Sequence, residues 1–473
     1  MTTATPATHR EAPPPGDRLL VATMFWVFGI AVANTTSGAI AQPAIADAFG
    51  AGAADVGAIV FGYSTTFAVM TAMYGSLARR FGLARCLAFG VALVAIGAGI
   101  AVVATNLPML IAARVLQGFG AGAIPTLSMA LISRRLSGPA RARALGINVA
   151  AVGIGFAAGP LLGGLLLEAF DWHGAMALGL LVAPAALIIP RLDPTPGDRT
   201  APLDVPGIAL LAVSVAGVVL TINRLPVLGV GPIIGAIVLV AGAAFVLLTL
   251  RSRGRVEPAL PLGELAHPVL RRAMLMGFVG QTAFFGILVL APLVGARVHD
   301  VQGVQLGLLL VPMAVLIAIV SPRNGRLSDR IGRRETTTVS LVVIVAAAVF
   351  LVLVGPGADL AIMMVGLLVA GFGFGLLSAP LAGEVSRTFP DNRRSVALGI
   401  YNLAFFMGTA SGTAIATGFV QSGVELHLFA GRPLSGASTA LVVLAALPFI
   451  ALLYDRIRPV PATPSPDHAP ASG

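Results

Sequence analysis

Long apolar runs separated by short charged loops make up most of this chain. A transmembrane helix needs roughly 20 apolar residues to cross a bilayer, and the runs are of about that length or longer. They are continuously apolar, whereas the strands of a membrane barrel alternate polar and apolar residues over about ten positions. The pattern therefore predicts an all-α membrane protein with fourteen transmembrane helices, in the charge-free stretches 19–46, 56–78, 86–113, 115–133, 144–167, 172–190, 205–223, 225–250, 273–296, 301–322, 336–358, 360–383, 395–424 and 433–454.

The loops between these runs differ strongly in charge on the two sides of the membrane. When the loops are assigned to alternate sides, 26 of the 30 arginines fall on one side, three on the other and Arg114 within a span. Positive charge marks the cytoplasmic side. We therefore expect a multi-pass protein of the bacterial inner (plasma) membrane with both termini in the cytoplasm.

The composition agrees with this interpretation. Only 11% of the residues are charged and 57% are hydrophobic, whereas a soluble domain has about a quarter charged residues. The net charge of +10 comes from the loop arginines, so it indicates membrane orientation and not a nucleic-acid partner. The partners that we expect are the lipid bilayer and a small molecule.

Segments in the N-terminal and C-terminal parts of the chain have similar sequences. The segment that begins at Ile132, ISRRLSGPARARALGI, matches VSRTFPDNRRSVALGI from Val385 at an offset of 253 residues. Because the copies lie eight spans apart, we predict two six-helix halves separated by two extra helices. Parallel repeats place a substrate path at the interface between the halves. The expected segments are a disordered tail at 1–18, a half at 19–190, the extra helices with their loops at 191–256, a second half at 257–455 and a tail at 456–473.

Four motifs resemble those of the major facilitator superfamily, in particular its fourteen-span drug:proton antiporters of the tetracycline-efflux type. Residues 75–82 and the fuller copy at 325–334 resemble the family motif G-x-L-x-D-R-x-G-R-R. Residues 114–120 resemble R-x-x-Q-G-x-G, and residues 155–164 contain the G-P-x-x-G-G motif associated with exporters. The resemblance implies a major facilitator fold, alternating access and proton coupling.

The resemblance also implies which residues gate and couple transport. Asp329 would form a latch at the inner gate. In the first copy of the motif Arg79 stands at the corresponding position, so that copy lacks the carboxylate. The alternatives are a solvated loop for Asp329, a structural role for Arg114, and plain small-residue packing for the glycines around Pro160, which we expect to kink its helix. The candidates are Arg114, Gln117, Gly118, Gly155, Gly159, Pro160, Gly163, Gly164, Gly325, Asp329, Arg330, Gly332 and Arg333.

No predicted span carries an acidic residue near its middle. A proton carrier needs a titrating group in the path, and the Asn34-Thr35-Thr36 segment of the first span cannot titrate. The candidates are Glu384 at the cytoplasmic end of the twelfth span and Asp47 and Asp55 outside, unless each is simply a loop charge. We therefore expect a neutral, zwitterionic or weakly anionic substrate.

Polar and aromatic residues at mid-helix are candidates to line a substrate cavity. Apolar walls with a few polar groups suit an amphipathic ligand. The alternative for each residue is ordinary helix–helix packing. The candidates are Asn34, Tyr63, Asn148, Gln281, Phe284, Phe285, Tyr401, Asn402 and Phe405.

These features predict a secondary active transporter that exports a small amphipathic compound such as an antibiotic or natural product by proton antiport. The alternatives are an importer or facilitator of a small metabolite, and a membrane sensor or scaffold, for which the loops are too short. The sequence shows no metal-ligand spacing, phosphate-binding loop or nucleophile triad, so we expect neither an enzyme nor a cofactor or metal. We expect a monomer, with the proton as coupling ion.

Overall fold

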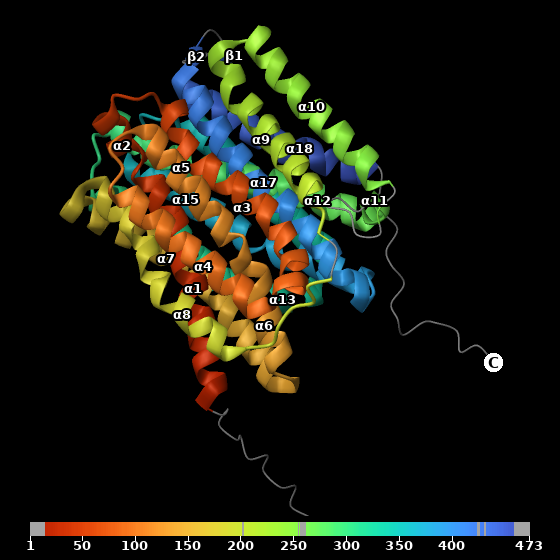
Figure 1. Ribbon diagram of the computed structural model, residues 1–473. Helices are drawn as coiled ribbons and strands as arrows, with labels where there is room; N and C mark the ends of the chain where they lie inside the picture. The colour runs from red at the N-terminus through yellow and green to blue at the C-terminus, as the bar shows by residue number, and fades with distance from the viewer. Residues whose placement is uncertain are drawn as a thin grey trace, which may run out of the picture.

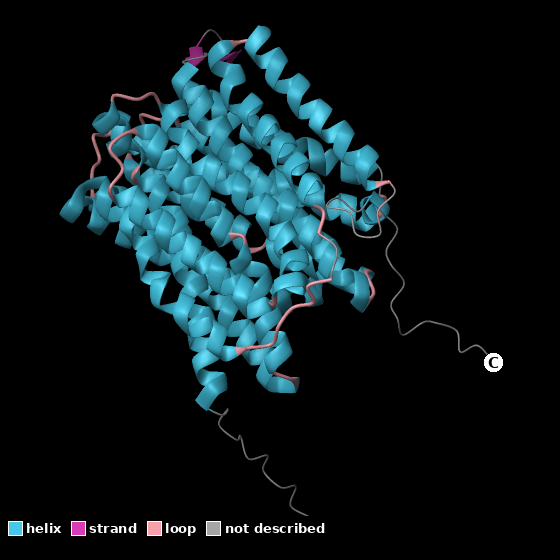
Figure 2. Ribbon diagram, viewed as in Figure 1, coloured by secondary structure: helices cyan, strands magenta, loops and turns pink. Residues whose placement is uncertain are grey.

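A computed structural model describes residues 15–200, 203–253, 255, 262–422, 426–429 and 432–457 as a bundle of long helices (Figures 1 and 2). In the first part of the chain the elements are α1 (Pro15–Ile40), α2 (Gln42–Phe49), α3 (Ala53–Phe81), α4 (Leu83–Val102), α5 (Leu107–Ala121), α6 (Ala123–Arg135), α7 (Gly138–Ala177), η1 (Leu178–Val182), α8 (Ala183–Leu192), α9 (Val205–Leu228) and α10 (Pro232–Ser252). They are followed by α11 (Leu262–Leu265), α12 (Pro268–Val298), α13 (Val304–Ile331), α14 (Arg333–Val354), α15 (Leu360–Gly375), α16 (Ser378–Thr388), α17 (Asp391–Ser422), β1 (Leu426–Phe429), β2 (Arg432–Leu434) and α18 (Gly436–Ile457).

Thirteen helices in the described residues are long and apolar enough to cross a membrane. One of them, 158–192, contains a reversal, because Phe170 and Asp171 leave helical backbone angles. The contacts of Ser37 on α1 demonstrate the reversal, because Ser37 touches both sides of it. Gly163 packs against Ser37, and Ser37 Oγ donates to the Ala175 carbonyl at 3.1 Å. Twelve residues of straight helix would separate 163 from 175 by about 18 Å. The fifth and sixth spans are therefore antiparallel, which accommodates the fourteen predicted spans.

Equivalent helices begin at the offsets of the sequence repeat. Helix α5 begins at Leu107 and α15 at Leu360, 253 residues later, and α4 and α14 begin at Leu83 and Arg333, 250 residues apart. The packing repeats as well, because α1 lies against α7 as α12 lies against α17. The interface between the halves is formed by α3 against α17 and by α7 against α13.

The two extra helices attach to one edge of this arrangement. Helix α9 packs on α3 and α17, one helix from each half, and α10 packs on α9 at the edge of the bundle (Figure 1). Arg224 on α9 pairs with Asp55 of α3 at 2.8 Å. The neighbouring Asn223 donates to Thr417 Oγ1 of α17 at 3.1 Å. Helix α9 is therefore tied to both halves.

Several local features differ from the sequence-based boundaries. The first apolar run is interrupted at Ala41, and α2 begins anew with Pro43 in its first turn. A short antiparallel pair, β1 and β2, precedes α18. Helix α1 begins at Pro15, inside the segment expected to be a tail, and α18 extends to Ile457. Residues 1–14 and 458–473 lie outside the described part of the chain.

The short connections between α3 and α4 and between α13 and α14 each depend on a glycine. Gly82 has φ 94° and ψ 140°, and Gly332 has φ 98° and ψ 144°. Side-chain-bearing residues avoid this region of backbone space. A Cβ at Gly82 would also lie 3.0 Å from the Thr195 carbonyl oxygen.

We expect Gly82→Ala to lower the free energy of unfolding by about 1–3 kcal/mol, because alanine is strained at this positive φ. Gly75→Ala is the matched control on the same helix, since nothing lies within 4 Å of its added Cβ. It should leave stability unchanged or raise it by about 0.5–1 kcal/mol. Thermal unfolding of the purified protein measures both variants. Equal unfolding temperatures for the two would contradict the role of Gly82.

Candidate functional site

A fully buried arginine lies within the N-terminal half. Arg114, on α5, has no exposed surface, and its Nη1 donates to Gln117 Oε1 at 2.7 Å. Its Nε donates to the Ile59 carbonyl on α3 at 3.4 Å. Asn34 Nδ2 on α1 donates to the same Gln117 oxygen at 3.3 Å. Three helices therefore bring together three candidate residues: Arg114, Gln117 and Asn34.

The charge of Arg114 has no acidic partner. No ion pair in the described part of the chain includes Arg114, and its guanidinium lies 4.8 Å from the centre of the Tyr63 ring. Three polar atoms of the cluster lack any hydrogen-bond partner among the described residues: Arg114 Nη2, Asn34 Oδ1 and Gln117 Nε2. A buried charge is costly in a membrane, and the ring supplies only part of the compensation. The cluster therefore keeps unused donors and an unused acceptor.

Tyr63 begins a line of aromatic rings that crosses between the two halves. Tyr63 and Phe67 on α3 stack with centroids 5.9 Å apart. Phe67 meets Phe406 on α17 edge to face at 4.4 Å. Phe406 contacts Phe405 at 5.4 Å, and Phe405 contacts Tyr401 at 5.7 Å. The predicted cavity residues Tyr63, Tyr401 and Phe405 therefore lie along one interface.

The other interface between the halves has its own aromatic group. Phe156 on α7 lies 6.2 Å from Phe284 and 6.3 Å from Phe285, both on α12. It also lies 5.6 Å from Phe374 on α15, which stacks on Phe284 at 3.8 Å. Phe67, Phe156, Phe374 and Phe406 were not among the predicted residues. Two of them carried a signal, since Phe67 follows Tyr63 by one helical turn and Phe406 adjoins Phe405.

The remaining polar candidates bond within one half. Gln281 Nε2 donates to Thr409 Oγ1 at 2.8 Å in the C-terminal half. Asn148 Nδ2 donates to Ser128 Oγ at 3.2 Å in the N-terminal half. The buried Tyr401 hydroxyl has no partner among the described residues, and Asn402 is partly exposed. Tyr401 is thus the polar candidate best placed to accept a new partner at the interface.

The glycine motif of α7 faces two helices. Gly155, Gly159 and Gly163 approach α1 so closely that a Cβ on any of them would collide with it. Pro160 and Gly164 instead contact α13, at Gly307 and Val304. Gly118 similarly abuts the Tyr63 carbonyl of α3. The expected kink at Pro160 is not observed as a break in helical angles, which occurs at Phe170 and Asp171.

A second buried charge cluster lies at the arginine-rich end of the C-terminal half. Arg272 on α12 pairs with Glu384 on α16 and with Asp455 on α18, each at 2.8 Å. Arg334 on α14 also reaches Asp455, at 3.2 Å. The Arg272 and Asp455 side chains are 4% and 6% exposed, and Glu384 is 21% exposed. The candidate Glu384 is therefore paired with Arg272, and the other members of the cluster were not predicted because they lie on different helix ends.

The predicted latch residue Asp329 lies nearby in an exposed position. Arg333 Nη2 donates to its carboxylate at 2.8 Å, and Arg387 lies at 3.4 Å. The hydrogen bond from Arg333 lowers the pKa of Asp329, so the carboxylate stays charged at neutral pH. Arg330 and Gly325 are exposed, while Gly332 makes the turn after α13. In the first copy Arg79 contacts Ser76 Oγ at 3.3 Å.

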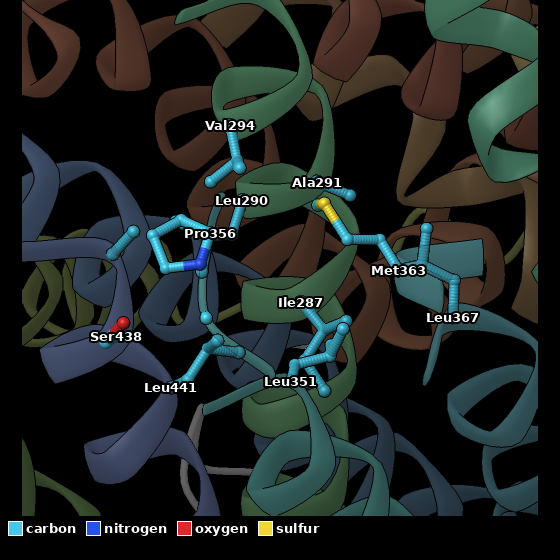
Figure 3. A pocket seen from close by; sticks show the side chains of 12 residues that line it. Ile287, Leu290, Ala291, Val294, Leu351, Pro356, Met363, Leu367, Ser438 and Leu441 are labelled. Atoms are coloured by element: carbon cyan, nitrogen blue, oxygen red, sulfur yellow. The ribbon is translucent and has the colours of Figure 1, made fainter. Parts of the chain in front are cut away.

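The outer acidic candidates and a small cavity in the C-terminal half fit a substrate poorly. Asp55 is paired with Arg224, and Asp47 is exposed. A cavity of about 30 Å³ lies among α12, α14, α15 and α18, with the mostly apolar lining that Figure 3 shows. That volume has room for only about two or three water molecules, since one water needs about 10–15 Å³ on this measure. Among the features described so far, the two interfaces between the halves therefore offer the better substrate site.

Comparison with known proteins gives the family. The model of the Major Facilitator Superfamily matches residues 21–413, and the chain belongs to this superfamily. It is therefore a multi-pass membrane transporter and not an enzyme. A crystal structure of the human organic anion transporter MFSD10 (TETRAN) matches with a TM-score of 0.62 and 17% identity, covering 93% of this chain and 99% of that one.

Characterised relatives include several exporters of drugs. The chain is 30% identical over 387 residues to the drug efflux pump JefA of Mycobacterium tuberculosis, covering 79% of this chain and 75% of the pump. It is 30% identical to the methylenomycin A resistance protein of Streptomyces coelicolor, covering 78% and 77%. It is 24% identical to the riboflavin transporter RibZ of Clostridioides difficile, covering 78% and 82%.

We expect the two buried arginines to respond in opposite ways to replacement by methionine. Arg272→Met leaves Glu384 and Asp455 without their main partner and should lower the free energy of unfolding by about 3–5 kcal/mol. Arg114→Met removes a charge that has no acidic partner, so stability should be retained or increased while transport falls.

Thermal unfolding of both purified variants, together with transport by reconstituted protein, measures this contrast. A large loss of stability in Arg114→Met would show that its charge is compensated in the folded protein. Full transport by a stable Arg114→Met protein would remove Arg114 from the functional site.

Proposed function

We propose that this transporter exports a small amphipathic compound, such as an antibiotic or natural product, from the cytoplasm by proton antiport. The unpaired buried charge of Arg114 is the observation that carries the substrate class. A cationic substrate would be repelled by it, since no ion pair in the described residues offsets the charge. A neutral, zwitterionic or weakly anionic compound could use the unpartnered groups of Arg114 and Asn34.

The two aromatic groups at the interfaces support an amphipathic ligand. Rings from both halves meet there, at Phe67 and Phe406 on one side and at Phe156 and Phe284 on the other. Such rings provide apolar area, and the Tyr401 hydroxyl adds a polar group. The drug-exporting relatives from Mycobacterium tuberculosis and Streptomyces coelicolor point the same way.

The contacts between the halves support alternating access. At the arginine-poor end the halves approach closely: Gly57 abuts Thr417, Gly52 abuts Gln421 and Gly164 abuts Val304. We place the arginine-rich end in the cytoplasm by the positive-inside rule, in a bacterial plasma membrane with both termini inside. An exporter loads its substrate in a state that is closed on the outer side, and the close contacts at this end support such a state. We further propose that it acts as a monomer without a cofactor.

The Arg272 cluster supplies the proposed proton carrier. Two carboxylates share Arg272, and Glu384 is the more exposed of the two at 21%. Protonation of Glu384 would leave the Arg272–Asp455 pair intact. Glu384 can therefore exchange a proton at the cytoplasmic end without leaving a buried charge unpaired.

Expression in a strain that lacks its own efflux pumps tests export. Susceptibility to a panel of antibiotic classes should fall for at least one class, with lower accumulation of that compound. A protonophore should restore accumulation, because it removes the driving force. If no susceptibility changes, export of antibiotics is contradicted.

The competing function is import of a small metabolite, which the riboflavin transporter relative favours. Uptake into cells or vesicles distinguishes the two directions. Accumulation of riboflavin or a similar metabolite above the control level, with unchanged antibiotic susceptibility, would support the importer.

Glu384→Gln should abolish substrate-driven proton movement in reconstituted vesicles, because an amide cannot carry a proton. The exposed Glu335→Gln is the matched control, since it lies near the same end outside the buried cluster. It should move protons like the unaltered protein. A Glu384→Gln protein that still drives acidification with substrate is incompatible with Glu384 as the carrier.

A further inference from the structure

A pocket of about 510 Å³ lies at the arginine-rich end of the N-terminal half, away from the interfaces between the halves. It is walled by α3, α4, α5 and the loop before α9. Three arginines and four aromatic residues contribute to its lining, among them Arg85, Arg199, Tyr74, Phe89 and Phe119. It plays no part in the proposed transport path.

The loop that forms one wall is fixed to the helices. Asp198 N donates to the Arg79 carbonyl at 2.8 Å, at the end of α3. Gly197 lies directly over Gly82, where a Cβ would collide with the backbone. Asp193 accepts from Thr195 N at 3.2 Å and pairs with Arg134 at 3.4 Å. These contacts fix the loop to the ends of the helices that form the rest of the pocket.

The pocket has a strongly positive end. Arg85 and Arg199 are exposed, and no ion pair in the described residues includes either one. No acidic residue lines the pocket. The neighbouring Asp198 carboxylate already accepts from Thr200 N at 2.9 Å and from its hydroxyl at 2.5 Å. Both arginines are thus available for an anion such as a phosphate.

The rest of the pocket is apolar and opens toward lipid. Phe89 and Phe119 are 57% and 38% exposed on helices that cross the membrane. Tyr74 is only 2% exposed, yet its hydroxyl has no hydrogen-bond partner in the described residues. Cationic and aromatic surfaces side by side match an amphiphile whose anionic head lies at the membrane surface.

The repeat provides an internal comparison. At the offset of 250 residues, Arg85 corresponds to Glu335 and Arg79 to Asp329. The pocket residue Arg85 therefore has an acidic counterpart in the C-terminal half. That half instead carries Arg333 and Arg334 at the positions of Leu83 and Ala84, so the two copies distribute their charge differently.

We propose that this pocket binds an anionic phospholipid of the adjoining leaflet, with its phosphate at Arg85 and Arg199 and its acyl chains along Phe89 and Phe119. Basic pockets between transmembrane helices on the cytoplasmic side are suited to such headgroups. A lipid accounts for both ends of the pocket, whereas a free phosphate ion would use only the arginines.

Native mass spectrometry of the purified full-length protein, titrated with phosphatidylglycerol or phosphatidylcholine, tests the proposal. The unaltered protein should retain phosphatidylglycerol preferentially. Arg85→Gln combined with Arg199→Gln should weaken that retention by about tenfold or more. Arg135→Gln combined with Arg456→Gln is the control, because it removes the same charge from exposed arginines outside the pocket. It should change retention by less than about twofold.

Two further measurements separate the sources of the anion. Phe89→Ala should weaken retention of phosphatidylglycerol without changing charge, and inorganic phosphate at millimolar concentration should not displace the lipid. Displacement by phosphate, with no effect of Phe89→Ala, would assign the pocket to a free anion and overturn the lipid site. Equal loss in the pocket variant and the control would reduce the effect to general surface charge and also overturn it.

Discussion

The close approach of paired helices is the constraint on which this structure depends. In a membrane, the water that drives apolar side chains together elsewhere is absent, so packing and internal hydrogen bonds hold helices together. Here glycines on α7 admit α1, and Gly408 and Gly412 on α17 admit α12 in the same way. Any side chain at these positions would separate the helices that carry Asn34, Gln281 and their partners.

The two halves share a backbone plan but treat buried charge differently. The C-terminal half neutralises Arg272 with two carboxylates. The N-terminal half leaves Arg114 with an aromatic ring, an amide and a carbonyl. The Arg272 cluster joins the ends of four helices. The Arg114 cluster leaves a positive electrostatic potential inside the bundle. The two halves thus share an arrangement of helices but differ in the partners of their buried arginines.

Much of the fold could be predicted because membrane solvation acts on every residue of a span. The apolar runs, the arginine asymmetry and the matching Gly82 and Gly332 turns are local signals. Contacts between distant helices are not local. Asp455 directly follows the last predicted span, yet it lies beside Arg272, 183 residues away. Phe156 gave no sign that it meets Phe374 across the bundle.

The candidate site shows the same division. Arg114, Gln117 and Asn34 could be chosen because a polar residue is conspicuous in an apolar helix. That they form one cluster, without a carboxylate, follows only from the crossing of α1, α3 and α5. The reversal at Phe170 and Asp171 carries no proline of its own and was not predicted from the residues there.

Helix α9 changes what the two halves can do mechanically. Arg224 binds α9 to α3 and Asn223 binds it to α17. One helix therefore bridges the interface between the two halves at the arginine-poor end. Separation of the halves at this end must break either the Arg224–Asp55 ion pair or the Asn223–Thr417 hydrogen bond. The half that keeps its contact with α9 also moves with α10, which packs on α9. The two extra helices therefore move with one half only, and the movements of the two halves are not symmetric.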